Sequence, residues 1–493
     1  MKRFASTLNK RAVISTMGAM MTCIGAIMII PAAVGIYFNE INSVKSFIAV
    51  SISCLLIGGT INVLFPPGKA GIKSRDGFII VALCWFMASI LGALPFILSG
   101  EITNPFDAFF ETCSGFSTTG STILQKPEIL SKSLLFWRSF THWLGGMGII
   151  VLVTALIPSF GIGGQEIAGV ETPGPISTKL SSQFSDTAKK LYLVYIFFTI
   201  AEFCLLLPSG MGIFDAAVHT FGTVGTGGFS SHTESIAYFG SGYVEWIIII
   251  FMILCGINFN LFFLIIGRKI KDFIRDEELR LYLAIIFFGA LIITLNRALQ
   301  GHVDALITGF RESMFQIVSI ITTTGYATSD YTLWPLFSQM IILFVMITGA
   351  CSSSTGGGIK LIRIIMAFKH VKRGFFLKLH PKRVNNITIN SKGVDQVVVT
   401  NTLNFIFFYI ALTFLGSILV SLDDVDMMTA FSAVITCLSN VGPGFSQVGP
   451  SMNFALLNDF SKFILSVLMI AGRLEIFTLF IVLSPRYWNS NRV

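Results

Sequence analysis

Residues 106–121 read FDAFFETCSGFSTTGS, and three later segments repeat this pattern. They are FDAAVHTFGTVGTGGF (214–229), RESMFQIVSIITTTGY (311–326) and MTAFSAVITCLSNVGP (428–443). Aligned without gaps, the four segments share a glycine column, which holds Gly120, Gly228, Gly325 and Gly442. Each is too short to cross a bilayer, because a spanning helix needs about twenty apolar residues. A half-length helix that ends in a Thr/Gly-rich loop, used four times, predicts a four-sided pore built by one chain.

The composition indicates a polytopic membrane protein. Of the 493 residues, 53% are hydrophobic and 12% are charged, whereas soluble proteins average roughly 25% charged residues. The eight cysteines include no Cys-x-x-Cys pair, so we expect buried free thiols rather than disulfides. The basic N-terminus and the apolar run to Phe38 resemble a signal peptide, but the run is too long, and we expect a retained helix.

The net charge of +8 reflects the position of the basic residues and not a nucleic-acid surface. They gather at both termini and in four loops, and these places alternate with sparsely basic loops. The positive-inside rule therefore predicts cytoplasmic termini and pore-like segments that open to the outer face. The longest basic stretch, residues 369–396, either anchors to anionic lipid headgroups or docks a cytosolic regulatory subunit.

Ten apolar stretches are long enough to span a bilayer. They lie near 12–37, 46–65, 76–99, 133–158, 187–208, 243–267, 279–299, 333–368, 397–420 and 458–484. The predicted fold is therefore all-α, with ten transmembrane helices and four re-entrant pore helices in a pseudo-four-fold arrangement. An N-terminal two-helix unit (1–68) precedes four M1–pore helix–M2 repeats, at 69–180, 181–275, 276–395 and 396–493.

The aligned triplets predict a selectivity filter for a cation. They are Thr118-Thr119-Gly120, Thr226-Gly227-Gly228, Thr323-Thr324-Gly325 and Asn440-Val441-Gly442. Glycine allows the positive φ angles that turn successive carbonyls toward one axis, and carbonyls replace the water around an ion without binding it too tightly. No triplet contains a carboxylate, which favours a monovalent ion.

The third M2 contains Gly349 and, further on, Ser352, Ser353, Ser354, Thr355, Gly356, Gly357 and Gly358. Helix propensity is poor in such a run. A broken helix at membrane depth is tolerated where it lines a cavity or is buried in protein, so we expect an intramembrane loop at 349–358 below the filter. A helix-packing surface of small residues is the alternative.

Arg473 is the anomalous charge of the last span, with Glu475 close by in sequence. Charges inside a span face the bundle interior or an aqueous path. Arg473 is therefore either a structural residue, paired with the glutamate or capping carbonyls, or a positive plug that binds the 349–358 loop and repels cations. Arg138, His142 and Arg311 are predicted to form structural pairs.

Acidic residues mark the starts of the pore helices. Asp107 and Asp215 share a column with Glu312, and Thr429 takes that column in the fourth segment, just after Asp423, Asp424 and Asp426. They either cap the helices and complement their dipoles or form an outer vestibule that concentrates cations.

The chain shows no signal for an enzyme. GIGGQEIAG (161–169) lacks the Gly-Lys-Ser/Thr of a nucleotide site, and the six histidines have no ligand spacing. A membrane enzyme acting on lipid would need an interfacial catalytic cluster, and the sequence contains none. We expect no catalytic residue, no cofactor and no transition-metal site.

The triplets, the TGGGIK end of the third M2 and the GRLEIFTL segment together resemble the Trk/Ktr/HKT potassium-transporter superfamily, and the extra N-terminal helix pair resembles its TrkH branch. The resemblance implies potassium uptake across the bacterial inner membrane by a homodimer with one pore per chain. It also implies gating by cytosolic, nucleotide-binding TrkA-type (RCK) subunits.

The resemblance assigns selectivity to the four glycines and gating to the 349–358 loop with Arg473. Gly120, where a serine is associated with sodium permeation, favours potassium. The loop reads ACSSSTGGG, with serines where the family commonly has small apolar residues and glycines, so its flexibility is expected to differ. A Na⁺-permeable or ion-symporting transporter of the same fold is the alternative function.

Overall fold

The computed structural model describes residues 8–66, 74–148, 184–303, 305–381 and 386–488. Helices dominate these residues, and a small antiparallel sheet joins β1 (Thr388–Ile389) to β2 (Lys392–Gly393). The predicted boundaries at 68/69 and 180/181, the glycine-rich segment 161–169 and residues 149–158 of the span predicted at 133–158 lie outside the described residues.

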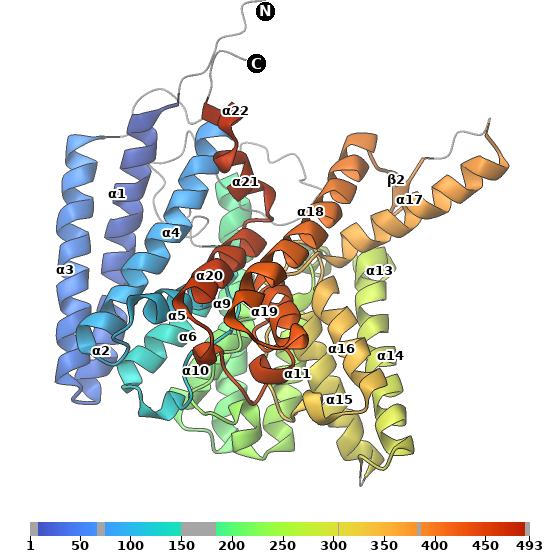
Figure 1. The fold of residues 1–493 in the computed structure, drawn as a ribbon, viewed down its shortest axis with the longest axis horizontal. Coiled ribbons are helices and arrows are strands. Elements are labelled where there is room, and N and C mark those ends of the chain that lie inside the picture. The colour runs from blue at the N-terminus through green and yellow to red at the C-terminus, as the bar shows by residue number, and fades with distance from the viewer. Residues whose placement is uncertain (1–7, 67–73, 149–183, 304, 382–385, 489–493) are drawn as a thin grey trace, which may run out of the picture.

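The N-terminal unit is a pair of long helices that lies to one side of the rest of the chain (Figure 1). It consists of α1 (Lys10–Ile27) and α2 (Ile29–Tyr37), which continue each other through Met28, and α3 (Ile41–Leu64). Small residues let α1 and α3 approach closely: a Cβ on Gly58 would lie 2.6 Å from the carbonyl oxygen of Gly18. This is the kind of glycine contact that holds helices together in membranes.

Each repeat has a long helix, a short buried helix and a further helix. The first repeat has α4 (Ser74–Ser99), α5 (Pro105–Phe116) and α6 (Lys132–Gly146), and the second has α9 (Phe184–Leu206), α10 (Ile213–Gly225), α11 (Gly242–Gly256) and α12 (Phe259–Ile266). The third has α14 (Glu277–Leu299), α15 (Leu306–Ile321), α16 (Leu336–Thr348) and α17 (Leu361–Leu379), and the fourth has α18 (Gln396–Val420), α19 (Met427–Ser439), α20 (Asp459–Arg473) and α21 (Phe477–Leu483).

Short elements complete the described chain. The short α-helices are α13 (Ile270–Arg275) and α22 (Pro485–Trp488). Turns of 3₁₀ helix lie at Pro127–Ile129, Leu207–Ser209, Ser235–Phe239, Tyr331–Leu333, Ser421–Asp423, Ser446–Val448 and Phe454–Leu456. The start of α1 and the end of α22 lie at the same end of the molecule (Figure 1).

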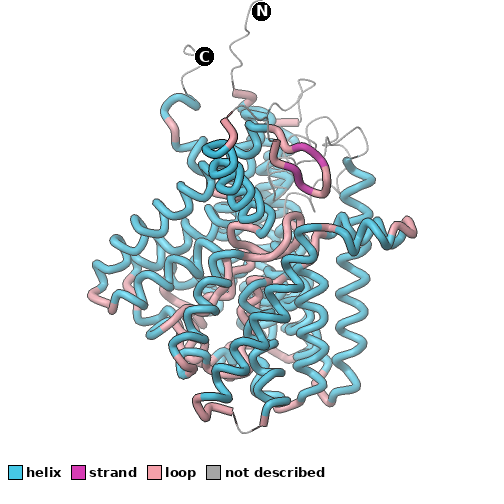
Figure 2. Tube along the Cα trace, turned by 90° about the vertical axis from the view of Figure 1, so that its right-hand side faces the viewer, coloured by secondary structure: helices cyan, strands magenta, loops and turns pink. Residues whose placement is uncertain are grey.

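Six described helices are long and apolar enough to cross a membrane, or eight if each of two bent helix pairs counts as one span. The predicted total of ten stays a prediction, because residues 149–158 of the first M2 lie outside the described residues and α16 has only 13 residues. The pore-like helices α5, α10, α15 and α19 sit deep in the protein. Figure 2 shows loop segments that run through the interior between helices.

The predicted M2 spans at 243–267 and 458–484 are not continuous helices. The chain bends by 93° between α11 and α12 and by 115° between α20 and α21. Asn258 caps the new helix by accepting a hydrogen bond from the Asn260 amide, and Glu475 and Ile476 have positive φ angles of 55° and 57°. A β-branched residue in this region is an outlier, and tertiary packing around the buried Ile476 overrides its local preference.

All eight cysteines are free thiols, as predicted, but not all are buried: Cys204 is exposed on α9 and Cys23 is partly exposed. The buried apolar side chains form two large clusters. One joins the N-terminal unit to the first and fourth repeats, and the other joins mainly the second and third repeats. The loops that follow α5, α10, α15 and α19 abut one another in the interior.

Candidate functional site

The four short helices α5, α10, α15 and α19 end in the same backbone turn. The first residue of each predicted triplet has a φ of 54° to 58°, and the glycine two positions later has a φ of 78° to 101°. The amide of the middle residue donates to the carbonyl five residues earlier at 2.8 to 2.9 Å in every copy. Threonine rarely adopts positive φ, and such outliers cluster at functional sites. The four segments that share a sequence pattern therefore also share a backbone conformation.

The glycines close the four turns into a ring. A Cβ on Gly120 would lie 2.1 Å from the carbonyl oxygen of Gly227, and one on Gly228 would lie 1.9 Å from that of Thr324. A Cβ on Gly325 would lie 2.2 Å from Val441 O, and one on Gly442 would lie 2.8 Å from Thr119 O. Each contact joins one repeat to the next, and the last returns to the first. The structure therefore brings together all twelve predicted triplet residues.

The chemistry of this ring, which we call the triplet ring, is neutral and rich in oxygen. Its members are the twelve residues of the four triplets, and none carries a charge. The C-terminal ends of four helices point toward it, and these ends carry partial negative charge. Backbone carbonyls in such a setting can replace the hydration shell of a monovalent cation.

Asn440 takes the place of a threonine in the fourth triplet and braces the ring. Its side-chain amide donates to Thr119 Oγ1 and to the carbonyl of Met469 on α20, both at 2.9 Å. On the outer side, Ser121 Oγ donates to Gly442 O at 3.0 Å. The fourth repeat is thus tied directly to the first, which the alignment did not reveal.

Behind the ring, three residues make the structural contacts that the sequence predicts. Arg138 pairs with Glu111 at 2.5 Å, and Arg311 pairs with Glu245 at 2.8 Å. Glu111 also accepts from the Ile123 amide at 3.0 Å and so fixes the strand that follows the first triplet.

His142 supports the ring through both of its nitrogens. Nδ1 lies 2.8 Å from Gly115 O, and the amide of Phe229 donates to Nε2 at 3.3 Å. Since Nε2 accepts, Nδ1 carries the proton, and the imidazole is neutral. Its ring also fills the space next to Gly227, where a Cβ would lie 2.2 Å from it.

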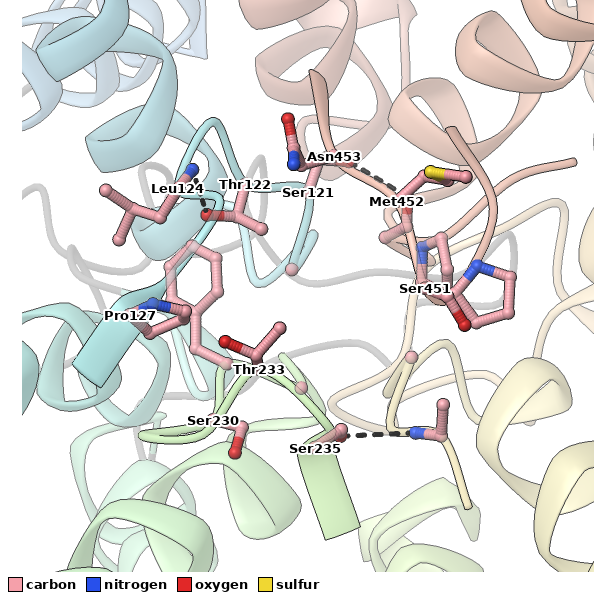
Figure 3. Close-up of a pocket in the computed structure, with 18 of the residues that line it drawn as sticks. Ser121, Thr122, Leu124, Pro127, Ser230, Thr233, Ser235, Ser451, Met452 and Asn453 are labelled. Carbon is pink, nitrogen blue, oxygen red and sulfur yellow. Dashed lines mark hydrogen bonds between the residues drawn. The ribbon is translucent and has the colours of Figure 1, made fainter. Parts of the chain in front are cut away.

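A pocket of about 90 Å³ opens onto the four glycines of the ring. Ser121 and Thr122, residues 451–453, and the segment from Ser230 to Ser235 face it from different repeats (Figure 3). Arg138 and His232 are the titratable side chains among its described lining residues, and no carboxylate is among them. The described lining of the pocket therefore carries no negative charge, and the pocket is not an acidic mouth.

The acidic residues at the pore helices have structural partners instead. Asp426 caps α19 by accepting from the Thr429 amide at 3.0 Å, and Asp215 accepts from Ser231 Oγ at 2.7 Å. Asp107 pairs with Lys462, and Glu312 pairs with Arg297, both at 2.6 Å. Glu312 lies in the second turn of α15, so it cannot act as a first-turn cap. These contacts favour the capping and pairing interpretation over an acidic vestibule.

The third M2 is broken between α16 and α17, and residues 349–360 form a loop that we call the intramembrane loop. It packs against the first residues of the triplets: a Cβ on Gly357 would lie 2.2 Å from Ser439 O and 3.0 Å from the Cβ of Asn440. The alternative prediction, a continuous helix that packs through its small residues, is therefore wrong.

Arg473 lies at the end of α20 and joins this loop to the first repeat. It donates to Thr355 O at 2.7 Å, to Gly145 O at 2.5 Å and to Gly146 O at 2.7 Å. The Glu475 carboxylate pairs with Arg363. The sequence allowed either a structural residue that caps carbonyls or a plug that binds the loop. The contacts show parts of both, because one guanidinium caps the carbonyls of α6 and binds the loop.

Comparison with known proteins places this arrangement in a family. A family model described as TrkH, cation transport protein, matches residues 43–490. The chain belongs to the TrkH family. The resemblance predicted from the sequence is thereby confirmed.

Individual TrkH-family members match over nearly their whole length. The Trk system potassium uptake protein TrkH of Salmonella typhimurium is 37% identical, with 98% of this chain and 100% of the relative covered. The Trk system potassium uptake protein TrkG of Escherichia coli is 34% identical, with 98% and 100% covered. The crystal structure of the potassium transporter TrkH from Vibrio parahaemolyticus matches with a TM-score of 0.87 at 34% identity, covering 98% of this chain and 100% of that one.

Two residues that hold the intramembrane loop of this TrkH-family chain were missed from the sequence. Glu278 accepts from the Ser352 amide and from Ser352 Oγ, both at 2.7 Å, and from the Ile362 amide at 3.0 Å. Lys360 is buried, has a φ of 76°, and donates to the carbonyl of Gly356. Glu278 stands beside Glu277 at the start of α14, where a pair of acids predicts only a helix N-terminus.

Within the described residues, no group of three or more His, Cys, Asp or Glu side chains is arranged to hold a metal ion. The oxygens of the triplet ring are of a different kind, since they belong to backbone carbonyls, hydroxyl groups and the side-chain amide of Asn440.

Proposed function

We propose that this chain carries K⁺ across the membrane through the triplet ring. The closed order of the ring, in which each glycine abuts the middle carbonyl of the next repeat, is the observation that carries the proposal. Relatives over the whole length are named Trk system potassium uptake proteins. A negative interior potential favours entry by about 2.3 kcal/mol per charge per 100 mV, so no coupled ion is required.

The same proposal assigns gating to Gly349, Ser352, Ser353, Ser354, Thr355, Gly356, Gly357, Gly358 and Arg473. Three hydrogen bonds from Arg473 tie the loop to α6 under the ring. In this position the loop and the guanidinium obstruct a cation that leaves the ring, by volume and by charge. The chain itself catalyses no reaction in this proposal and needs no cofactor.

Membership of the TrkH family supports a wider proposal. We propose that the chain has ten membrane spans and four pore helices, with both termini in the cytoplasm. We also propose that it lies in the bacterial inner membrane, in contact with lipid, as a homodimer. A cytosolic TrkA-type nucleotide-binding partner would act from the side of the basic segment 369–395, which continues from the loop through α17. The "Trk system" in the names of the relatives supports a multi-component assembly, and nothing suggests nucleic acid as a partner.

Ion flux into liposomes tests the proposal. The purified full-length chain is measured with K⁺, Rb⁺ and Na⁺ in turn, and K⁺ and Rb⁺ flux are expected to exceed Na⁺ flux. Equal Na⁺ flux would favour the Na⁺-permeable alternative, and uptake that requires a proton or sodium gradient would favour symport. Absence of flux for all three ions, also in the Arg473→Ala variant, would contradict the proposal.

A further inference from the structure

Thr323 differs from its counterparts in the triplet ring. The amide of Gly357 in the intramembrane loop donates to Thr323 Oγ1 at 2.6 Å. The equivalent hydroxyl of Thr226 donates to Gly225 O of its own turn at 2.7 Å. That of Thr118 is buried and has no hydrogen-bond partner among the described residues. The loop therefore forms a hydrogen bond to the first-position hydroxyl of one repeat.

The loop reaches this position because two of its residues are glycines. A Cβ on Gly356 would lie 2.7 Å from Thr322 O, and one on Gly357 would lie 2.2 Å from Ser439 O. Both oxygens are backbone atoms at the ends of α15 and α19, so they cannot rotate away. The register of the loop against the inner side of the ring is thus set by close backbone contact.

The same short segment is held by Arg473 two residues earlier. The guanidinium donates to Thr355 O, whereas Gly357 donates to Thr323. Two residues of chain can span only about 7 Å when fully extended. A displacement that carries Thr355 more than about 7 Å from the present position of Gly357 must therefore also move Gly357 and break its bond to Thr323.

We propose that Thr323 couples the loop to the ring, an inference that rests on the proposed function. A hydroxyl oxygen has two lone pairs, and the Gly357 amide uses one while the loop is in place. When the loop withdraws, this lone pair is released to a cation at the inner end of the ring. Opening of the loop and completion of the innermost cation site are then one event.

Thr323→Val tests the coupling in the purified full-length chain in liposomes, because valine keeps the shape and removes the hydroxyl. Loss of one neutral hydrogen bond, ~1 kcal/mol, should raise K⁺ flux without a partner protein about fivefold. The K⁺:Na⁺ flux ratio should fall at the same time. Thr323→Ser restores the hydroxyl and should return both quantities toward the wild-type values.

Thr118→Val is the matched comparison, since it removes an equivalent hydroxyl that has no bond to the loop. A rise in flux for Thr323→Val that is no larger than for Thr118→Val would overturn the coupling. So would a failure of Thr323→Ser to restore the wild-type flux. In both cases K⁺ flux through the wild-type chain would still support the proposed function. If neither the wild-type chain nor Arg473→Ala carried K⁺, the proposed function itself would be rejected.

Gly357→Ala provides a second test that leaves Thr323 intact. Its Cβ would collide with Ser439 O and dislodge the loop from the ring, so flux without a partner should rise. Thr323→Val added to Gly357→Ala should give no further rise, because the bond is already broken. A full additive rise would show that the two residues act independently and would overturn the proposal.

Discussion

The triplet ring and the intramembrane loop lie against each other, yet they are held together in different ways. In the ring, the same φ angles and the same amide-to-carbonyl bond recur in four repeats, and the side chains that touch it are mostly uncharged. In the loop, a single segment is fixed by the charged residues Arg473, Glu278 and Lys360. The side chains of the four repeats differ, so a structure that all four share must be held mainly by backbone contacts. A unique structure can use individual charges, and we therefore assign selection to the ring and gating to the loop.

The largest effect on ion selectivity is expected from Gly120→Ser, which breaks the ring itself. Gly120 has a φ of 84°, and a Cβ there would lie 2.1 Å from Gly227 O, so the neighbouring turn must move. We expect the K⁺ over Na⁺ flux ratio to fall at least about tenfold, equivalent to ~1.4 kcal/mol. Ion substitution in liposomes measures it.

Gly100→Ser is the control for this change. Gly100 has a φ of 81°, but a Cβ at this position would meet no atom within 4 Å, so the variant experiences the same backbone strain away from the ring. Its flux ratio should match the wild type. If both variants behave alike, strain alone explains the loss, and the ring contact has no role in selection.

Arg138→Ala tests how far the ring depends on the buried charges behind it. It leaves Glu111 buried without its partner, and such a change costs about 3–5 kcal/mol. We expect a large drop in melting temperature in detergent. The matched variant Arg311→Ala breaks a more exposed pair and should lower the melting temperature by less, because water screens a more exposed pair more strongly. Equal drops would contradict the assigned difference in burial.

Arg473→Ala separates the gate from the ring. It removes three hydrogen bonds from a charged donor, and one such bond contributes about 1.5–3 kcal/mol. Because these bonds hold the loop in place, flux without a partner should rise at least about tenfold. The K⁺:Na⁺ ratio should change much less than in Gly120→Ser. Arg473→Lys keeps the charge but not the fork of donors, and an intermediate flux is expected. A flux at the wild-type level in Arg473→Ala would place the gate elsewhere.

Glu278→Gln should have the smallest effect. The amide keeps one oxygen for the backbone of Ser352 and Ile362 but loses the acceptor for Ser352 Oγ. We expect flux without a partner to rise about twofold, because one hydrogen bond of ~0.5 kcal/mol is weakened. Glu277→Gln, on the neighbouring residue that pairs with Lys369 away from the loop, is the control and should leave flux unchanged.

Much of the candidate site could be predicted because its signals are local. The glycine column, the absence of carboxylates in the triplets and the run of small residues at 349–358 are visible in single segments. The breaks after Gly256 and Arg473 were missed because both lie inside long apolar stretches, whose length predicts one continuous span. Contacts with distant segments favour those bends: the Asn258 side-chain amide donates to Ser352 Oγ, and Ile476 is buried in the apolar core.

The sequence alone establishes four repeats, their glycines, the apolar spans and an anomalous arginine, because each depends on composition or on spacing within a few residues. Only the tertiary structure decides the cyclic order of the ring, the pairing of Glu475 with Arg363, and the choice of carbonyls by Arg473. The physical reason is distance along the chain. Arg473 and Gly145 are 328 residues apart, and no local pattern indicates which of many buried carbonyls a guanidinium will meet.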